Sequence, residues 1–331
     1  MMIRAAVLPF ACKYRFSRLC ASLTAVLMGA LLSSSAVTQR VSSNANEVSM
    51  RIADGLKQIQ EGKQNGLSDS TLGYLWAKLA DSYQEAADWK KALAAYEHAL
   101  QLLGEAREDR ANYATALDNL GSLYLEFGRI GEAEKLRKRA LAIRKEIGSP
   151  QEIAWSEADM AEVALLKHRF KDAEKASRAV FETMSAEEQS RDNVSTELSA
   201  LVTLIFAECM QSKQEEGLRE AERAMQLVEK NLPADSVDQA HVSMALGFAQ
   251  WKTGANAEAE RSMLDGLRIL RSRSGPTSPN LRAAMYEYRG FLKAMHRGPE
   301  VTAIEKRLAE MTPQDTSKSC AGCTVSVYAL R

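Results

Sequence analysis

The chain has 331 residues, of which 46% are hydrophobic, and its 43 basic side chains balance its 43 acidic ones. This composition is typical of a folded protein with a sizeable core, and it excludes the basic excess that nucleic-acid binding requires. The length predicts two domains or one elongated array.

Residues 1–36 have the pattern of a secretory signal peptide. Four basic side chains and no acidic one accompany the apolar run LCASLTAVLMGALL, and the small residues Ser34 and Ala36 follow it. The run is shorter than the roughly 20 residues that a membrane-spanning helix needs. We therefore expect cleavage near Ala36 and an exported protein, periplasmic or extracellular. The alternatives are an uncleaved segment that anchors the chain and a mis-assigned start codon. Beyond this segment no contact with a membrane is expected.

Residues 37–66 are expected to lead into the folded region. The stretch 37–46, VTQRVSSNAN, consists mostly of small polar residues and predicts a flexible lead. From Glu47 onward the apolar residues return at helical spacing. This change predicts an N-terminal cap helix before the first repeat.

From residue 67 to residue 312 one pattern returns about every 42 residues. Its clearest copy is Leu120-Gly121-x-x-Tyr124, followed by Gly128 and Ala133. The pattern predicts six units, because equivalents of Leu120 stand at Leu79, Met160, Leu204 and Leu246, and MHRGPEVTAIEKRL belongs to a weaker sixth copy.

Each unit has the pattern of two amphipathic helices. Leu117, Leu120 and Tyr124 share one face of a first helix, and Gly128 predicts its end, where glycine adopts a left-handed conformation at little cost. One hairpin cannot bury both of its faces, whereas stacked neighbours can. No sustained strand-like alternation occurs before the last ten residues, so we predict an all-α solenoid.

The Leu-Gly pair with its tyrosine, the turn at Gly128, and the small residues Ala133 and Ala140 resemble the tetratricopeptide repeat. The period near 42 is similar to the long variety found in kinesin light chains. The resemblance implies a right-handed superhelix whose first helices line a concave groove. It also implies that this groove binds a protein or peptide segment.

In that family an asparagine just before the Leu-Gly pair often contacts the backbone of the ligand. Asn119 occupies this position in the second unit, whereas the equivalents in other units are Lys78, Asp159, Thr203 and Ala245. The groove face of the first helices is therefore the candidate binding site, and the alternative is an ordinary solvated helix face. The candidate residues are Lys78, Asp81, Asp118, Asn119, Ser122, Asp159 and Glu162.

The tail, residues 313–331, contains the C-x-x-C motif Cys320-Ala321-Gly322-Cys323. We expect a disulfide or an inert tail, with a redox pair and half of a zinc site as alternatives. Zinc would need two more ligands, and only Cys209 and four scattered histidines remain in the mature chain. We expect no metal site.

Motifs of nucleotide binding, of serine hydrolases and of zinc proteases are absent from the sequence. We therefore expect a non-enzymatic interaction module or scaffold that needs no cofactor and binds a protein or peptide, without nucleic acid. Two alternatives remain open. One is a structural component of an envelope assembly that packs through its ends, and the other is a thiol-dependent role of the tail.

Overall fold

The computed structural model describes residues 35–86, 88–104, 109–184 and 191–311, and these residues form helices and turns without a strand. Residues 1–34 of the predicted signal segment 1–36, and Cys320 and Cys323, lie outside the described residues. The helices in chain order are α2 (Ser35–Gln64), α3 (Asp69–Glu85), α4 (Trp89–Leu103), α5 (Arg110–Glu126), α6 (Ile130–Ile147), α7 (Pro150–Leu166), α8 (Phe170–Met184), α9 (Arg191–Met210), α10 (Gln214–Asn231), α11 (Val237–Lys252), α12 (Asn256–Ser274), α13 (Pro279–Ala294) and α14 (Gly298–Met311).

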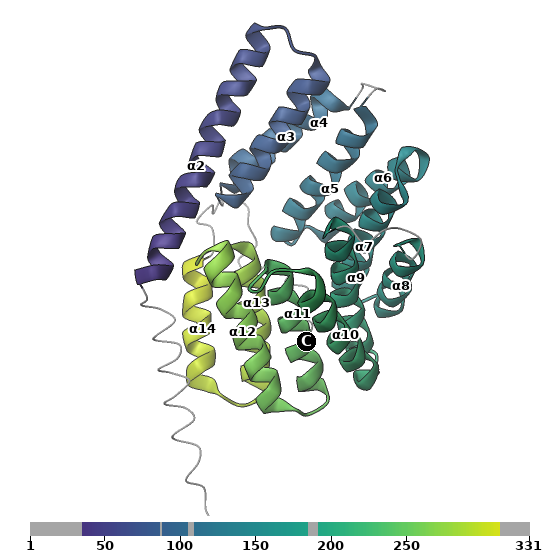
Figure 1. Ribbon diagram of the computed structural model, residues 1–331, viewed down its shortest axis with the longest axis vertical. Coiled ribbons are helices and arrows are strands. Elements are labelled where there is room, and N and C mark those ends of the chain that lie inside the picture. The colour runs from purple at the N-terminus through teal and green to yellow at the C-terminus, as the bar shows by residue number, and fades with distance from the viewer. Residues whose placement is uncertain (1–34, 87, 105–108, 185–190, 312–331) are drawn as a thin grey trace, which may run out of the picture.

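The helices from α3 onward pair as six antiparallel hairpins, which confirms the predicted all-α solenoid. Each hairpin stacks on the next through its second helix, so that α4 contacts α5 and α6 contacts α7. We call α3, α5, α7, α9, α11 and α13 the inner helices and their partners the outer helices. Figure 1 shows the stack curving, and the curve brings α12 into contact with α2.

Each turn inside a hairpin repeats one backbone conformation. A left-handed residue follows the inner helix at every described turn position, namely Gly128, His168, Ser212, Gly254 and His296. The spacings between these positions are 40, 44, 42 and 42 residues. The next amide donates to the carbonyl five residues earlier, for example Arg129 N to Tyr124 O at 2.8 Å. This is the Schellman motif, and it satisfies carbonyls that a helix end leaves unpaired.

Serine caps define where four of the inner helices begin. The side chain of Ser149 accepts from the amide of Glu152 at 3.3 Å, and the carboxylate of Glu152 accepts from the amide of Ser149 at 2.8 Å. Such caps fix the first turn of a helix and contribute about 1 kcal/mol each. The equivalent serines are Ser68 before α3, Ser236 before α11 and Ser278 before α13.

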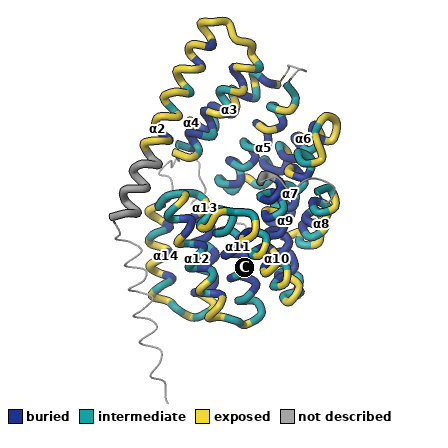
Figure 2. The backbone as a smooth tube through the Cα atoms, viewed as in Figure 1, coloured by how far each residue is buried: buried dark blue, intermediate teal, exposed yellow. Residues whose placement is uncertain are grey.

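Buried side chains divide between two main clusters. One joins α2 to the first two hairpins, and the other extends from α7 to α14. Figure 2 shows the buried backbone concentrated in α9 and α11, with exposed residues along α2. The stretch Asn193–Met210 in α9 is long and apolar enough to cross a membrane, but most of it is buried within the described fold. Its composition fits the central helix of this core.

The N-terminal lead differs from the sequence-based expectation. Residues 37–46 belong to α2, which runs without interruption from Ser35 to Gln64. The stretch contains neither glycine nor proline, so nothing in it ends a helix once one has formed. Further along α2, the side chain of Ile59 is buried against the first hairpin.

Candidate binding groove

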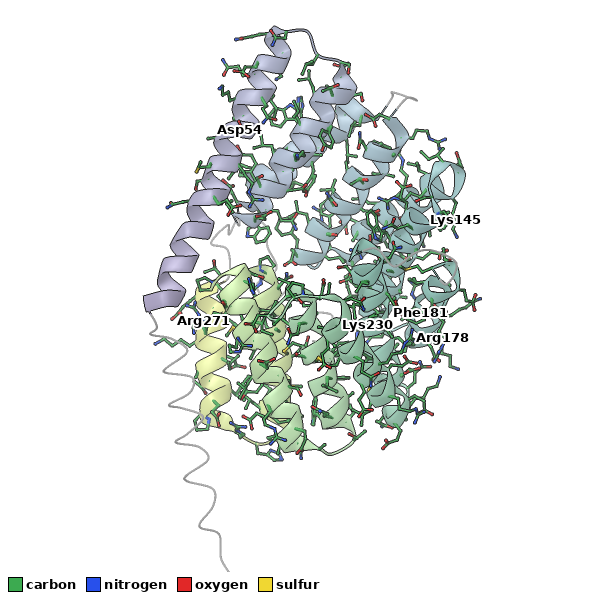
Figure 3. The ribbon with its side chains drawn as sticks, viewed as in Figure 1. Asp54, Lys145, Arg178, Phe181, Lys230 and Arg271 are labelled. Carbon is green, nitrogen blue, oxygen red and sulfur yellow. The ribbon has the colours of Figure 1, made fainter. Side chains whose placement is uncertain are left out.

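Three adjoining cavities follow the inner helices. Their volumes are about 540, 370 and 230 Å³, and we call them the first, second and third cavity in that order. Asn119 lines both the first and the second cavity, Ser195 and Ser199 line the second and the third, and Glu126 lines the third and the first. The three cavities therefore adjoin one another, and we call them together the groove. Figure 3 shows Lys145, on the outer helix α6, at the opposite, outer rim.

Six of the seven candidate residues predicted from the sequence line this groove. Lys78 is the exception: its side chain is exposed, with its ammonium nitrogen 5.5 Å from the centre of the Tyr74 ring. The other candidates divide among the cavities. Asp81, Asn119 and Ser122 line the first, Asp118, Asn119 and Asp159 line the second, and Glu162 lines the third.

Asn119 is held against a carboxylate of the preceding hairpin. Its side-chain amide donates to Oδ1 of Asp81 at 3.1 Å, and the hydroxyl of Tyr96 donates to the same atom. Burial raises the pKa of Asp81, while the two donors act against this rise. The hydrogen bonds fix the orientation of amide and carboxylate in the wall of the first cavity.

Arg137 reaches the groove from the outer helix α6. Its guanidinium donates to Glu162 Oε2 at 2.7 Å, to the carbonyl of Asp159 at 2.9 Å and to Ser122 Oγ at 3.1 Å. Gly121 leaves room for this side chain, because a Cβ atom there would stand 3.1 Å from Cγ of Arg137. The small residue of the Leu-Gly pair thus admits an arginine that links α5 to α7.

The same region holds two further carboxylates whose pKa values are raised, those of Asp118 and Asp159. Arg144 pairs with Asp118 and donates to Ser156 Oγ at 2.5 Å, and all three side chains are buried. Burial raises the pKa of Asp118, against the opposing effect of Arg144. At Asp159, burial and the neighbouring carboxylates of Asp118 and Glu162 raise the pKa to about 7 in spite of Arg137.

An ion pair joins two parts of the groove wall that are far apart in the sequence. Arg282 on α13 donates to Glu126 on α5 at 2.9 Å, although 156 residues separate them. The guanidinium also lies 6.0 Å from the centre of the Trp89 ring. The curl of the solenoid therefore brings the sixth hairpin against the first two, and Asn280 of α13 lines the first and the third cavity.

Glu287 on α13 is a buried acid that the sequence reasoning missed. Its residue is 3% exposed, and neither carboxylate oxygen has a hydrogen-bond partner among the described residues. Burial raises its pKa well above the usual value, and no neighbouring charge opposes the rise. Glu287 lines the third cavity. It stands 168 residues, or four periods, after Asn119, so extending the repeat register to the sixth unit would have pointed to it.

The buried cysteine and the described carboxylates do not form a metal centre. No group of three or more His, Cys, Asp or Glu side chains within the described ranges is arranged to hold a metal ion. Cys209 is buried, and burial raises the pKa of its thiol to about 12. The protonated thiol packs against α10, where a Cβ atom on Gly217 would lie 2.6 Å from its sulfur.

Residues 71–146, within the first two hairpins, match the family model of the tetratricopeptide repeat. No curated protein matches the chain. The match covers the stretch that contains Leu120-Gly121-x-x-Tyr124 and the turn at Gly128, the residues from which the sequence pattern was read.

Three solved structures are similar over most of this chain. The apo form of RapI shares 13% identity over 80% of this chain and 95% of its own, with a TM-score of 0.60. A Rap protein complexed with Competence and Sporulation Factor shares 12% over 80% and 87%, with a TM-score of 0.56. BtubC (BKLC) from P. vanneervenii shares 21% over 69% and 92%, with a TM-score of 0.53. These likenesses concern the fold: the chain is an all-α superhelical solenoid of tetratricopeptide-type hairpins.

Proposed function

We propose that this protein is a non-enzymatic interaction module that binds a protein or peptide segment along its concave groove. The observation that carries this proposal is that three cavities adjoin along the inner helices and share lining residues. Adjoining cavities offer several contacts to an extended segment, and the third cavity, at about 230 Å³, is below the usual size of a small-molecule site. Binding through several modest contacts is how helical repeat arrays use their concave surfaces.

The polar groups in the groove wall support the proposal because they are already oriented. Asn119, Asp81 and Ser122 are each held by a hydrogen bond from or to a neighbouring side chain. Groups fixed before binding lose little conformational entropy when a ligand arrives. The solved Rap protein in complex with Competence and Sporulation Factor offers a precedent for binding by a solenoid of similar fold.

The proposal is tested by partner capture with groove variants. Purified protein is crosslinked in the native envelope fraction, and captured partners are quantified for wild type, Asn119→Ala and Lys78→Ala. We expect Asn119→Ala to weaken capture about tenfold, because it removes a polar group from the centre of the groove. Lys78→Ala is the matched control, since Lys78 precedes its Leu-Ala pair as Asn119 precedes its Leu-Gly pair but lies outside the three cavities. Equal capture by both variants, with unchanged helical circular dichroism, contradicts the groove assignment.

We further propose that the chain acts outside the cytoplasm after cleavage near Ala36. The basic flank, the short apolar run and the small residues Ser34 and Ala36 support this. Mass spectrometry of the protein isolated from its own cells gives the test. An N-terminus at residue 37 or close to it is expected, and an intact Met1 in the mature protein contradicts cleavage.

A further inference from the structure

Within the proposed groove, the third cavity differs from the rest by its unpaired acid. Five inner helices converge on it: Leu125 comes from α5, Leu166 from α7, Val202 from α9, Met244 from α11 and Ala284 from α13. These five side chains are apolar, and the cavity of about 230 Å³ is smaller than an ordinary drug-sized site. Its size and walls suit one long side chain with an aliphatic stem.

The charges around this cavity are acidic. Glu126, Glu162, Asp238 and Glu287 line it, and His241 is the only lining residue that can carry a positive charge. Burial lowers the pKa of His241, which favours its neutral form. Glu126 is paired with Arg282 and Glu162 with Arg137, while Asp238 accepts from Ser195 at 2.9 Å. Among these four acids, Glu287 alone has no such partner in the described residues.

A buried carboxylate without a partner costs free energy, and a bound cation removes that cost. We propose that the third cavity takes a lysine or arginine side chain of the bound peptide, with Glu287 as its counterion. The aliphatic stem packs between Leu125, Leu166 and Val202, and the cationic end reaches Glu287. Since both oxygens of Glu287 are buried in the free protein, its side chain turns toward the cavity when the cation enters. This inference rests on the proposed function and names the chemistry of its ligand.

The test is a selection of peptides from a random dodecapeptide library displayed on phage, with purified wild-type protein as the target. We expect one position of the selected peptides to be enriched in lysine and arginine. Replacing that residue by norleucine, which keeps the stem and removes the charge, should weaken binding about 30-fold or more. The Glu287→Gln variant should bind the parent peptide more weakly than wild type does, to a similar extent. This variant should bind the norleucine peptide and the parent peptide equally well.

Glu208→Gln is the matched control. Glu208 is also buried and its pKa is also raised by burial, to about 7, but it pairs with Arg178 and does not line the cavity. It should leave the lysine preference unchanged. Enriched peptides without a basic position, or a preference that survives in Glu287→Gln, overturn this inference and leave the proposed function standing. If wild type enriches no peptide above background, the proposed function fails, and the inference fails with it.

Discussion

Buried charges in this protein stand in two opposite situations. Asp118 is compensated by Arg144 and Ser156, whereas Glu287 has no partner in the described residues. A raised pKa means that the folded state holds its proton at a pH where the unfolded chain has lost it. Stability that is fully present below the usual carboxyl pKa is therefore lost as the pH rises. Glu287 thus makes the fold weaker at neutral pH than at acidic pH.

Variants of Glu287 measure how much this residue lowers the free energy of unfolding. We expect Glu287→Met to raise the free energy of unfolding by about 1–3 kcal/mol at neutral pH, because it removes an unsatisfied buried polar group. Glu287→Gln should flatten the pH dependence of stability above the usual carboxyl pKa, because it removes the group whose pKa burial raises. Urea unfolding of both variants and wild type measures this, and the difference between curves isolates Glu287 from Asp159 and Glu208. Identical pH dependence in wild type and Glu287→Gln would show that the carboxyl titrates normally.

Arg144 is expected to stabilise the fold because it neutralises the buried carboxylate of Asp118. Its side chain is 5% exposed, and Arg144→Ala leaves Asp118 buried and without its ion-pair partner. We expect a loss of about 3–5 kcal/mol in the free energy of unfolding. The adjacent Lys145 pairs with Glu157 at 3.3 Å but is 54% exposed, so Lys145→Ala should cost less than about 1 kcal/mol. Comparable losses for the two variants would contradict the burial argument.

At the scale of elements, two glycines in one short stretch have different roles. Gly128 has a φ of 69° in the turn, whereas Gly131 lies in the first turn of α6, and a Cβ atom meets nothing within 4 Å at Gly131. We expect Gly128→Ala to cost about 1 kcal/mol through its left-handed backbone. Gly131→Ala should instead stabilise α6 by up to about 1 kcal/mol. Thermal unfolding distinguishes them, and a shift of the same sign in both variants would exclude the backbone as the cause.

The turns also show how far sequence reasoning extends. Gly128 and Gly254 indicate the left-handed residue directly, but His168, Ser212 and His296 adopt it without glycine. The hairpins could therefore be predicted from the period, since stacking forces every unit to turn at the same place. The contact of Arg137 with Gly121 could not be predicted. A small residue indicates that another group packs closely against it, but it does not identify that group. The full length of α2 was missed for a similar reason: polar composition suggests a loop, yet it does not end a helix.

At the scale of the whole molecule, the curl of the solenoid decides the shape of the groove. The contact between Arg282 and Glu126 depends on the sum of small rotations between successive hairpins. No local sequence pattern therefore predicts this contact. Six candidate residues were placed on the groove wall from the repeat register, because the inner helices recur in sequence. The α13 residues Glu287 and Asn280 were missed. The repeat register points to Glu287, but only the closure brings α13 to the same cavity as Glu126 on α5. The ion pair therefore joins two parts of the groove that the repeats alone leave separate.

This closure gives the last prediction. The side chain of Arg282 is 3% exposed, and that of Glu126 is 26% exposed. Losing one partner of such a pair costs about 2 kcal/mol or more, a factor of about 30 in an opening equilibrium. We expect Arg282→Met to speed amide hydrogen exchange in α13 and α14 by about that factor, with little change in α9 and α10. Arg289→Met is the matched control, because Arg289 lies on the same helix and pairs with Glu305 inside its own hairpin. Equal exchange in both variants would mean that hairpin stacking alone holds the solenoid closed.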